Sequence, residues 1–253
     1  MIFQNMFITL LMLCTGTVQS FNLYNNVNFC SYNVNLTEIV PNIQENRAAI
    51  IQTHFPTITT NTNNTLHYQY GGLPQLANLT DFSETIINSI HSNNFTESYN
   101  GLLIYDFEGW SPVWDTLNGV YKNASIAYIQ SVYPGVFPNI NDPVLILKAK
   151  QSWEASAMKL FIYAIQVGRS LIPEAKIGYY GYPSMPYWTN RSTNEQCREY
   201  NNKMSSLWEQ VDALLPSIYQ FYNSTGNFDT LMNNVEYVRS KIHESIRLRD
   251  QYN

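Results

Sequence analysis

The feature that most constrains this fold is an apolar run that ends in acidic residues and is followed by a long helix and a second apolar run. Residues 102–107 (Leu-Leu-Ile-Tyr-Asp-Phe) are typical of a buried parallel strand whose carboxyl end opens into a site. Asp142 and Pro143 predict a helix start, and Pro173 lies just past the end of the helical periodicity. Residues 177–182 predict the next strand. This order of strand, helix and strand indicates an α/β fold with a parallel sheet.

The remaining patterns fit one domain of the same class. Residues 57–65 are the most loop-like stretch. Four further elements are expected: a strand over residues 66–70, a helix over residues 82–90 capped by Asn78 or Thr80, a further α/β unit over residues 207–219 and a helix over residues 235–249. No repeat, linker or charge block divides residues 21–253, so they are predicted to form a single domain.

The composition excludes several functions. Charged residues make up 13% of the chain against a typical ~25%, and the net charge is −5 without a basic run. Nucleic acid is therefore not expected as a partner. No Gly-rich phosphate loop is present and the four His residues lack ligand spacing, so neither a cofactor nor a metal is expected. Ser217 lacks a nucleophile elbow, which disfavours a serine hydrolase.

Residues 1–20 have the pattern of a secretory signal peptide. Residues 6–14 form a short apolar core, and residues 18–20 (Val-Gln-Ser) offer small side chains at the usual cleavage spacing before Phe21. The core is far shorter than the ~20 apolar residues that a membrane span needs, so a membrane anchor is the weaker interpretation. The mature chain is predicted to be secreted, or delivered to a lysosome-like compartment, with no membrane span.

Potential N-glycosylation supports secretion. The chain contains 30 Asn, and seven of them begin an Asn-x-Ser/Thr tripeptide. A tripeptide that is used lies on the surface of a glycoprotein, although such tripeptides also arise by chance in an Asn-rich chain. The seven candidate sites are Asn35, Asn63, Asn78, Asn94, Asn123, Asn190 and Asn223.

Cysteine usage leaves the disulfide state open. Three Cys are too few for a disulfide-dense scaffold, and Cys14 would leave with the leader. Cys30 and Cys197 remain. In an oxidising compartment they bridge each other, pair outside the chain or stay free, and the sequence does not choose between these states.

The triplet Asp106-Phe107-Glu108 is the candidate catalytic centre. Side chains alternate along a strand, so the two carboxyl groups are expected on the same side, with roughly 6–7 Å between their Cβ atoms. Like charges this close resist double ionisation, so one pKa rises and that group is available as a general acid for a glycosidic oxygen. The alternative is a solvated pair of acids at a strand end.

Aromatic residues surround this triplet. Trp110 and Trp114 follow it, and such rings either stack on sugar faces or fill a core, the core being expected for at least one Trp. The predicted strand with Tyr179, Tyr180 and Tyr182 has two interpretations as well. It places phenol groups at the same site, or it packs them as an amphipathic strand.

Four stretches in the same order resemble the hyaluronidases of animals and venoms. Residues 104–112 (Ile-Tyr-Asp-Phe-Glu-Gly-Trp-Ser-Pro) are similar to that family's aspartate-aromatic-glutamate-x-Trp-Arg-Pro motif. The other three are Gly-Gly-Leu-Pro-Gln at residues 71–75, Gly-Tyr-Tyr-Gly-Tyr-Pro at residues 178–183, and Leu-Trp followed by Ala-Leu-Leu-Pro-Ser-Ile-Tyr within residues 207–219. Four ordered motifs are far more specific than any one of them.

The resemblance implies a distorted, TIM-like (β/α) barrel that hydrolyses β-1,4 N-acetylhexosaminidic bonds of hyaluronan, and often of chondroitin. It implies that Glu108 is the proton donor and that Asp106 helps to hold the proton and orient the acetamido group. The N-acetyl oxygen of the substrate is then the nucleophile. By the same resemblance, the substrate-binding residues are Tyr180, Ser217, Tyr219 and Lys241, the last in place of an Arg with a bidentate fork.

The chain also departs from the family pattern. Ser111 replaces an Arg after the acids, and Ser184-Met185 replaces the Asp-Cys that would supply a partner for Cys197. The chain stops where the family barrel continues, so the barrel is expected to lack its last strands, a Trp of the active site and the partner of Cys30. The alternative function is therefore a catalytically inactive or weak glycosaminoglycan-binding protein of the same fold.

Overall fold

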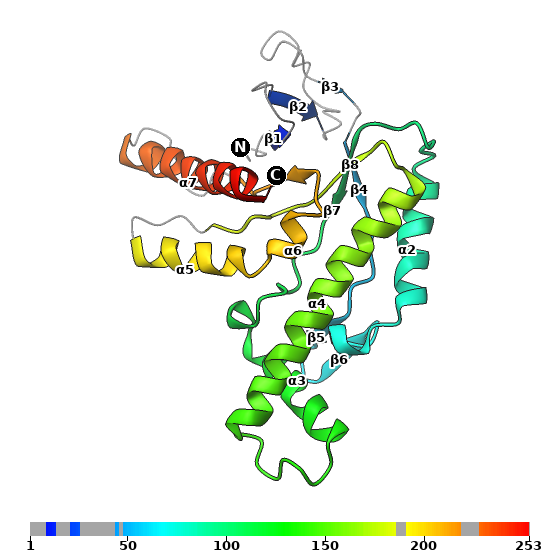
Figure 1. The fold of residues 1–253 in the computed structure, drawn as a ribbon, viewed down its shortest axis with the longest axis vertical. Helices are drawn as coiled ribbons and strands as arrows, with labels where there is room; N and C mark the ends of the chain where they lie inside the picture. The colour runs from blue at the N-terminus through cyan, green and yellow to red at the C-terminus, as the bar shows by residue number, and fades with distance from the viewer. Residues whose placement is uncertain are drawn as a thin grey trace. The chain divides into compact units, whose positions relative to one another are not determined.

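The computed structural model describes residues 9–13, 21–25, 44–45, 48–185, 191–218 and 228–252 (Figure 1). The chain forms two compact units, and each is described by itself. The first consists of Met1–Ile51, Thr96–Asp106 and Ile172–Asn253, and the second of Gln52–Phe95 and Phe107–Leu171. None of the described helices is both long and apolar enough to cross a membrane.

A parallel sheet of three strands forms the centre of the first unit. β4 (Ala48–Ile51), β7 (Leu102–Tyr105) and β8 (Lys176–Tyr179) lie in the order β4-β7-β8, and every residue of β7 is buried. Tyr105 pairs with Tyr179 at the ends of their strands. Carboxyl ends of parallel strands meet at one edge of a sheet, so the segments that follow β7 and β8 start side by side. The predicted parallel sheet is confirmed.

Both of these strands are shorter than the sequence predicts. β7 ends at Tyr105 and β8 ends at Tyr179. The ladder stops soon after Tyr179 because Gly181 has a φ of 81°, a left-handed conformation that turns the chain away from the strand direction. Asp106 and Glu108 therefore follow a strand instead of lying in it. The expectation that both carboxyl groups lie on one side of a strand is therefore wrong, because neither residue is part of the strand.

A short strand lies beside β8 in the first unit. This strand is β9 (Ala213–Leu214). Gly178 permits the approach, because a Cβ atom there would lie 2.4 Å from the carbonyl oxygen of Ala213. Asp212 fixes the segment, since its backbone N donates to the oxygen of Ile177 at 2.8 Å and its carboxylate accepts from the Ile177 N at 3.1 Å. The chain after β9 is thereby held to the edge of the sheet.

Three N-terminal strands and three helices complete the first unit. The strands are β1 (Thr9–Leu13), β2 (Phe21–Asn25) and β3 (Gln44–Glu45), which form one sheet with β9 in the order β3-β2-β1-β9. The helices are α5 (Arg191–Asn202), α6 (Ser205–Trp208) and α7 (Phe228–Tyr252). α7 confirms the predicted C-terminal helix and extends it at both ends. β1 lies inside residues 1–20, whose removal as a leader stays a prediction.

Three helices form most of the second unit. α2 (Leu79–Ser92) and α3 (Gly119–Val132) both contact α4 (Pro143–Leu171) (Figure 1). The predicted caps are confirmed, because Asn78 Oδ1 accepts from the first turn of α2 and Asp142 does the same for α4. α3 is not among the predicted elements, since its apolar residues do not gather on one face.

A β-hairpin precedes these helices. β5 (Thr57–Thr60) pairs antiparallel with β6 (Leu66–Gln69), so the expectation of a loop over residues 57–65 is wrong for its first four residues. Thr and Ile are β-branched and favour an extended strand, which outweighed the polar composition. Asn61 Oδ1 accepts from the Thr65 N at 2.8 Å and closes the turn. Two short 3-10 helices, η1 (Pro74–Leu76) and η2 (Trp114–Thr116), complete the unit.

Aromatic side chains fill the core of the second unit. Phe55 stacks on Phe107 with 4.2 Å between ring centroids, and Trp110 meets Phe107 edge-on at 4.8 Å. The indole N of Trp110 also donates to the oxygen of Pro56 at 2.6 Å. Trp110 and Trp114 are 5% and 6% exposed, so the core interpretation is confirmed for both Trp residues.

Candidate active site

Asp106 lies directly after β7, at the carboxyl edge of the parallel sheet in the first unit. Its side chain is exposed. Nearby protein atoms still desolvate the carboxyl group in part, and this desolvation raises its pKa above the ordinary value of 3.8. A carboxyl group with a raised pKa keeps its proton to a higher pH. The sequence predicted a raised pKa from repulsion between like charges, whereas the cause found for Asp106 is desolvation.

Glu108 follows two residues later, at the start of the second of the two segments that form the second unit, and its side chain is exposed. Its neighbours are anchored in that unit. Phe107 and Trp110 both pack into the aromatic core, and the backbone oxygen of Ser111 accepts from the indole N of Trp153 at 3.2 Å. The backbone that carries Glu108 is therefore fixed on both sides, while the side chain is open to solvent.

Two of the predicted substrate-binding residues meet in the first unit. Tyr180 follows β8 as Asp106 follows β7, and its backbone N donates to the oxygen of Tyr105 at 3.0 Å. Its phenol donates to the Ser217 Oγ, also at 3.0 Å. Ser217 is brought there by Leu215, which forms a β-bridge to Tyr180. The sheet edge therefore presents an acid and a pair of hydroxyl groups from neighbouring segments.

The tyrosines of the predicted second strand divide between core and site. Tyr179 is 1% exposed, and its ring centroid lies 5.3 Å from that of Tyr105. Burial raises the pKa of Tyr179 well above its ordinary value, so this phenol stays neutral. Tyr180 is only partly buried and reaches Ser217. The packing interpretation is confirmed for Tyr179, and the role of Tyr180 at the site stays a prediction.

Lys241 lies on α7 and is 6% exposed. Its ammonium group is 4.7 Å from the centre of the Tyr237 ring. Burial lowers the pKa of Lys241 to about 8, against a smaller opposing effect of Cys197. The Tyr237 phenol in turn donates to the backbone oxygen of Ser217 at 3.3 Å. Lys241 is therefore connected to the segment that carries Ser217 through Tyr237.

Tyr237 is a site residue that the sequence motifs missed. It is 4% exposed, and burial raises the pKa of its phenol while the hydrogen bond to Ser217 lowers it less. The phenol is thus a neutral donor at working pH. Tyr237 and Lys241 stand four residues apart on one helix, so helical spacing from Lys241 would have found it.

A buried carboxylate fixes α7 on α5. Glu244 is 1% exposed and accepts from Arg247 at 2.6 Å and from the Asn201 side chain at 2.9 Å. Arg198 lies 3.6 Å from the same carboxylate. A buried charge needs such partners, and here three side chains from two helices supply them. This network holds the turn of α7 that carries Lys241.

Cys197 is a free, half-buried thiol on α5. Met185, which is 2% exposed, occupies the position where the resemblance would place its partner. Burial, with a further contribution from Glu244, raises the pKa of the thiol, and Lys241 lowers it less. A thiol with a raised pKa is a poor nucleophile, so Cys197 is not a candidate for covalent catalysis. Cys30 lies outside the described residues.

The other predicted positions divide into those outside the described residues and those that are exposed. Tyr219, Asn35, Asn190 and Asn223 lie outside the described residues. Asn63, Asn78, Asn94 and Asn123 are all exposed, as an N-glycosylation site requires. Use of these four Asn residues stays a prediction. Within the described ranges, no three side chains of His, Cys, Asp or Glu gather to hold a metal ion.

The chain matches known proteins over most of its length. Residues 51–253 match the family described as hyaluronidase. Hyaluronidase conohyal-P1 of Conus purpurascens is 34% identical over 207 residues, which are 80% of this chain and 42% of that protein. A chondroitin hydrolase of Caenorhabditis elegans is 28% identical over 164 residues, which are 62% of this chain and 35% of that protein. The chain thus spans less than half the length of these curated relatives.

A solved structure shares the fold. The crystal structure of bee venom hyaluronidase in complex with a hyaluronic acid tetramer matches with a TM-score of 0.70 and 24% identity, over 83% of this chain and 65% of that chain. This likeness confirms the predicted fold class, a TIM-like α/β barrel of the hyaluronidase type. Since the family match extends over residues 51–253, the chain belongs to the hyaluronidase family.

Proposed function

We propose that this chain is a secreted endo-glycosidase that hydrolyses β-1,4 N-acetylhexosaminidic bonds of hyaluronan and, as a second substrate, of chondroitin. The observation that carries the proposal is the position of Asp106 and Glu108, two acids directly after β7 in a chain of this family. The names of the relatives support the substrate class: one is a hyaluronidase, one a chondroitin hydrolase. The bee enzyme was crystallised with a hyaluronic acid tetramer.

In the proposed mechanism, Glu108 donates a proton to the glycosidic oxygen as the bond from that oxygen to the anomeric carbon breaks. The acetamido oxygen of the same sugar attacks the anomeric carbon and forms a cyclic intermediate, as in other substrate-assisted glycosidases. Asp106 orients the acetamido group and accepts its N–H hydrogen bond. Water then opens the intermediate while Glu108 takes back a proton, which restores the enzyme.

The substrate-binding roles are assigned by position. Tyr180 and Ser217, linked at 3.0 Å, supply hydroxyl donors and acceptors for sugar groups beside Asp106. Tyr219 is proposed to contribute a phenol from the same segment. Lys241 is 6% exposed, so we assign it an indirect role: its charge acts on Tyr237, which holds the backbone of Ser217.

Secretion is part of the proposal. The leader pattern of residues 1–20 and the exposed Asn-x-Ser/Thr sites support an extracellular or lysosome-like location for a glycoprotein. A glycosaminoglycan substrate is extracellular or lysosomal, so substrate and enzyme would meet there.

Zymography of the secreted full chain on gels that contain hyaluronan or chondroitin tests the function. Clearing of either polymer by the wild type, and none by Glu108→Gln, is the expected result. A wild type that retards the polymer in an affinity gel without clearing it would instead establish the alternative, a glycosaminoglycan-binding protein without activity. A chain that neither clears nor binds either polymer would overturn the proposal.

A further inference from the structure

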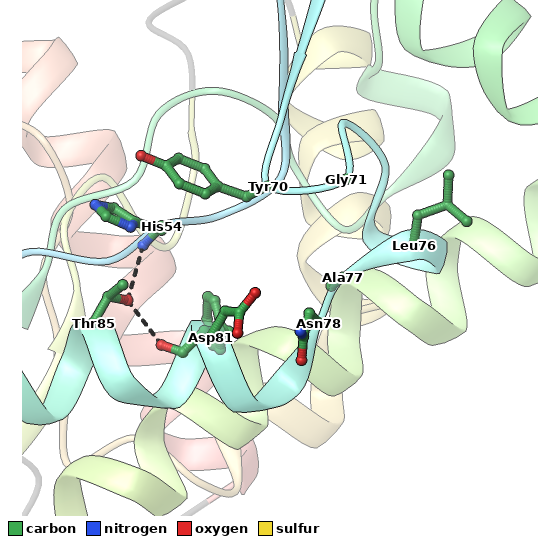
Figure 2. A pocket seen from close by; sticks show the side chains of 9 residues that line it. His54, Tyr70, Gly71, Leu76, Ala77, Asn78, Asp81 and Thr85 are labelled. Atoms are coloured by element: carbon green, nitrogen blue, oxygen red, sulfur yellow. Dashed lines mark hydrogen bonds between the residues drawn. The ribbon is translucent and has the colours of Figure 1, made fainter.

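A hollow of about 270 Å³ opens in the second unit, between the start of α2 and the turn that follows β6 (Figure 2). His54, Tyr70, Asn78, Asp81 and Thr85 contribute to its wall. Figure 2 shows the Tyr70 ring across the hollow from Asn78 and Asp81. The volume lies just below the ~300–1,000 Å³ of pockets that hold drug-sized ligands, so it suits a single ring-sized group.

Asn78, which lines this hollow, is also a candidate N-glycosylation site. It begins the tripeptide Asn-Leu-Thr, and its Oδ1 accepts from the Thr80 N at 3.1 Å to cap α2. N-glycosylation uses the other atom of the amide, Nδ2, so a sugar there leaves the helix cap intact. Among the four Asn-x-Ser/Thr sites that the structure describes, Asn78 lines this hollow and Asn63, Asn94 and Asn123 do not.

Tyr70 is held at the hollow at an energetic cost. Its φ of 52° lies in the left-handed region, where a bulky residue is strained and Gly or Asn is preferred. Its ring stacks on His54 with 4.2 Å between centroids and 13° between planes, and it remains 50% exposed. Strained residues gather at ligand clamps, where the surrounding structure holds them. An exposed aromatic ring fixed in this way offers an apolar surface to one face of a sugar.

Charge selects the kind of sugar. Asp81 places a carboxylate in the wall, which repels the uronic acids of a glycosaminoglycan but accepts hydrogen bonds from a neutral sugar. N-acetylglucosamine, the first sugar of an N-linked glycan, is neutral and carries both hydroxyl and N–H donors. We propose that this hollow seats the innermost N-acetylglucosamine of a glycan on Asn78. The inference rests on passage through the secretory pathway and is independent of the catalytic proposal.

The first test uses the wild-type chain, directed through a eukaryotic secretory pathway by a strong leader. Peptide N-glycosidase is applied to the native protein, and mass spectrometry follows the release of each glycan by site. The seated glycan on Asn78 should be released roughly three- to tenfold more slowly than the glycans on Asn94 and Asn123, since the packing of one aromatic contact is worth about that factor. After denaturation all sites should react alike. An unoccupied Asn78, or release at the same rate as from Asn94, would overturn the proposal.

Variants identify the contact. Tyr70→Asn removes the ring while suiting the left-handed backbone, so it should fold at least as well as the wild type and speed release from Asn78 to the rate seen for Asn94. Tyr133→Ala, which removes a comparably exposed ring from the end of α3, should change nothing at Asn78. Unchanged protection in Tyr70→Asn would overturn the assignment of the ring.

The same variant separates the glycan from the polymer. A hyaluronan oligosaccharide also carries N-acetylglucosamine and is the competing source of this sugar. Tyr70→Asn should leave the KM for hyaluronan unchanged, because in the wild type the chain's own glycan occupies the hollow. A rise in KM together with unprotected Asn78 would assign the hollow to the polymer and sink the glycan proposal, while clearing on the zymogram would leave the catalytic proposal standing.

Discussion

The phenol of Tyr180 donates a hydrogen bond of 3.0 Å to the hydroxyl of Ser217, across 37 residues of sequence. Each residue stands just past a strand or bridge: Tyr180 follows β8, and Ser217 lies two residues after the bridge at Leu215. The pair depends on the backbone bonds that hold Leu215 to Tyr182 and Gly181 at 2.8 and 2.9 Å. The position of the hydroxyl pair is therefore set by the edge of the sheet and not by a flexible loop.

Tyr180→Phe should raise the KM for hyaluronan by about 2- to 10-fold with a smaller effect on kcat, because one neutral hydrogen bond is worth roughly 0.5–1.5 kcal/mol. The ring and its packing remain, so the thermal midpoint should stay within a degree or two of the wild type. Tyr68→Phe, an exposed phenol on β6, is the matched control and should not change KM. A KM equal to that of the wild type would remove Tyr180 from the substrate-binding residues.

Glu108→Gln should lower kcat by about 10²–10⁴-fold and leave polymer binding nearly intact, since the amide keeps the shape and removes the transferable proton. Glu84→Gln, an exposed acid on α2, is the control and should retain full turnover. Initial rates on hyaluronan, with binding measured by affinity electrophoresis, check both parts. Turnover above a tenth of the wild-type value would contradict the proton-donor assignment.

Asp106→Asn should reduce the rate less than Glu108→Gln does and should alter the pH–rate profile. Burial raises the pKa of Asp106, so its ionised form is disfavoured in the folded state. Stability from this group is therefore lost as pH rises above its ordinary pKa, and an Asn, which does not ionise, avoids that loss. We expect Asp106→Asn to be at least as stable as the wild type at neutral pH by thermal unfolding. A destabilised variant with an unchanged pH profile would mean that Asp106 is structural.

Much of this arrangement could be predicted from local sequence. Asp106 was singled out because it stands at the end of an apolar run, and carboxyl ends of parallel strands carry active sites. Tyr180 was singled out by the family resemblance and by its place in the next predicted strand. The caps at Asn78 and Asp142 were found because the residue type itself makes the bond. In each case the information lies within a few residues of the feature.

The rest depends on packing between distant segments. The burial of Lys241 arises from tertiary packing, and no local pattern marks a lysine as 6% exposed. The contact of Tyr237 with Ser217 spans 20 residues and two elements. The end of β8 was misplaced because tyrosines continue past the turn at Gly181, and the end of β7 was misplaced because Phe107 lies beyond the strand and packs in the aromatic core. These features belong to tertiary structure, which periodicity does not encode.

Gly178→Ala should destabilise the first unit by about 1–3 kcal/mol, the usual cost of overpacking. Its added methyl would lie 2.4 Å from the backbone oxygen of Ala213, and a backbone atom yields less than a side chain. Because β9 leads to Ser217, the variant should also raise the KM for the polymer. Gly119→Ala is the control, since a methyl there meets nothing within 4 Å. Urea unfolding of both variants checks this, and equal midpoints would show that β9 moves freely away from β8.

Lys241→Met should stabilise the protein near neutral pH and remove part of its pH dependence. Burial lowers the pKa of Lys241 from 10.5 to about 8, so below pH 8 the folded chain carries a poorly solvated charge. Between about pH 8 and 10.5 the unfolded chain binds more protons at this site than the folded chain, and stability from this group rises with pH. The unfolding free energy of the wild type, measured relative to that of Lys241→Met, should rise by about 1 kcal/mol from pH 7 to pH 9. Urea unfolding at both pH values measures that difference. Lys241→Met also tests the proposed action of Lys241 through Tyr237. If Lys241 acts in this way, Lys241→Met and Tyr237→Phe should both raise the KM for hyaluronan. A raised KM in Lys241→Met with an unchanged KM in Tyr237→Phe would mean that Lys241 contacts the polymer directly.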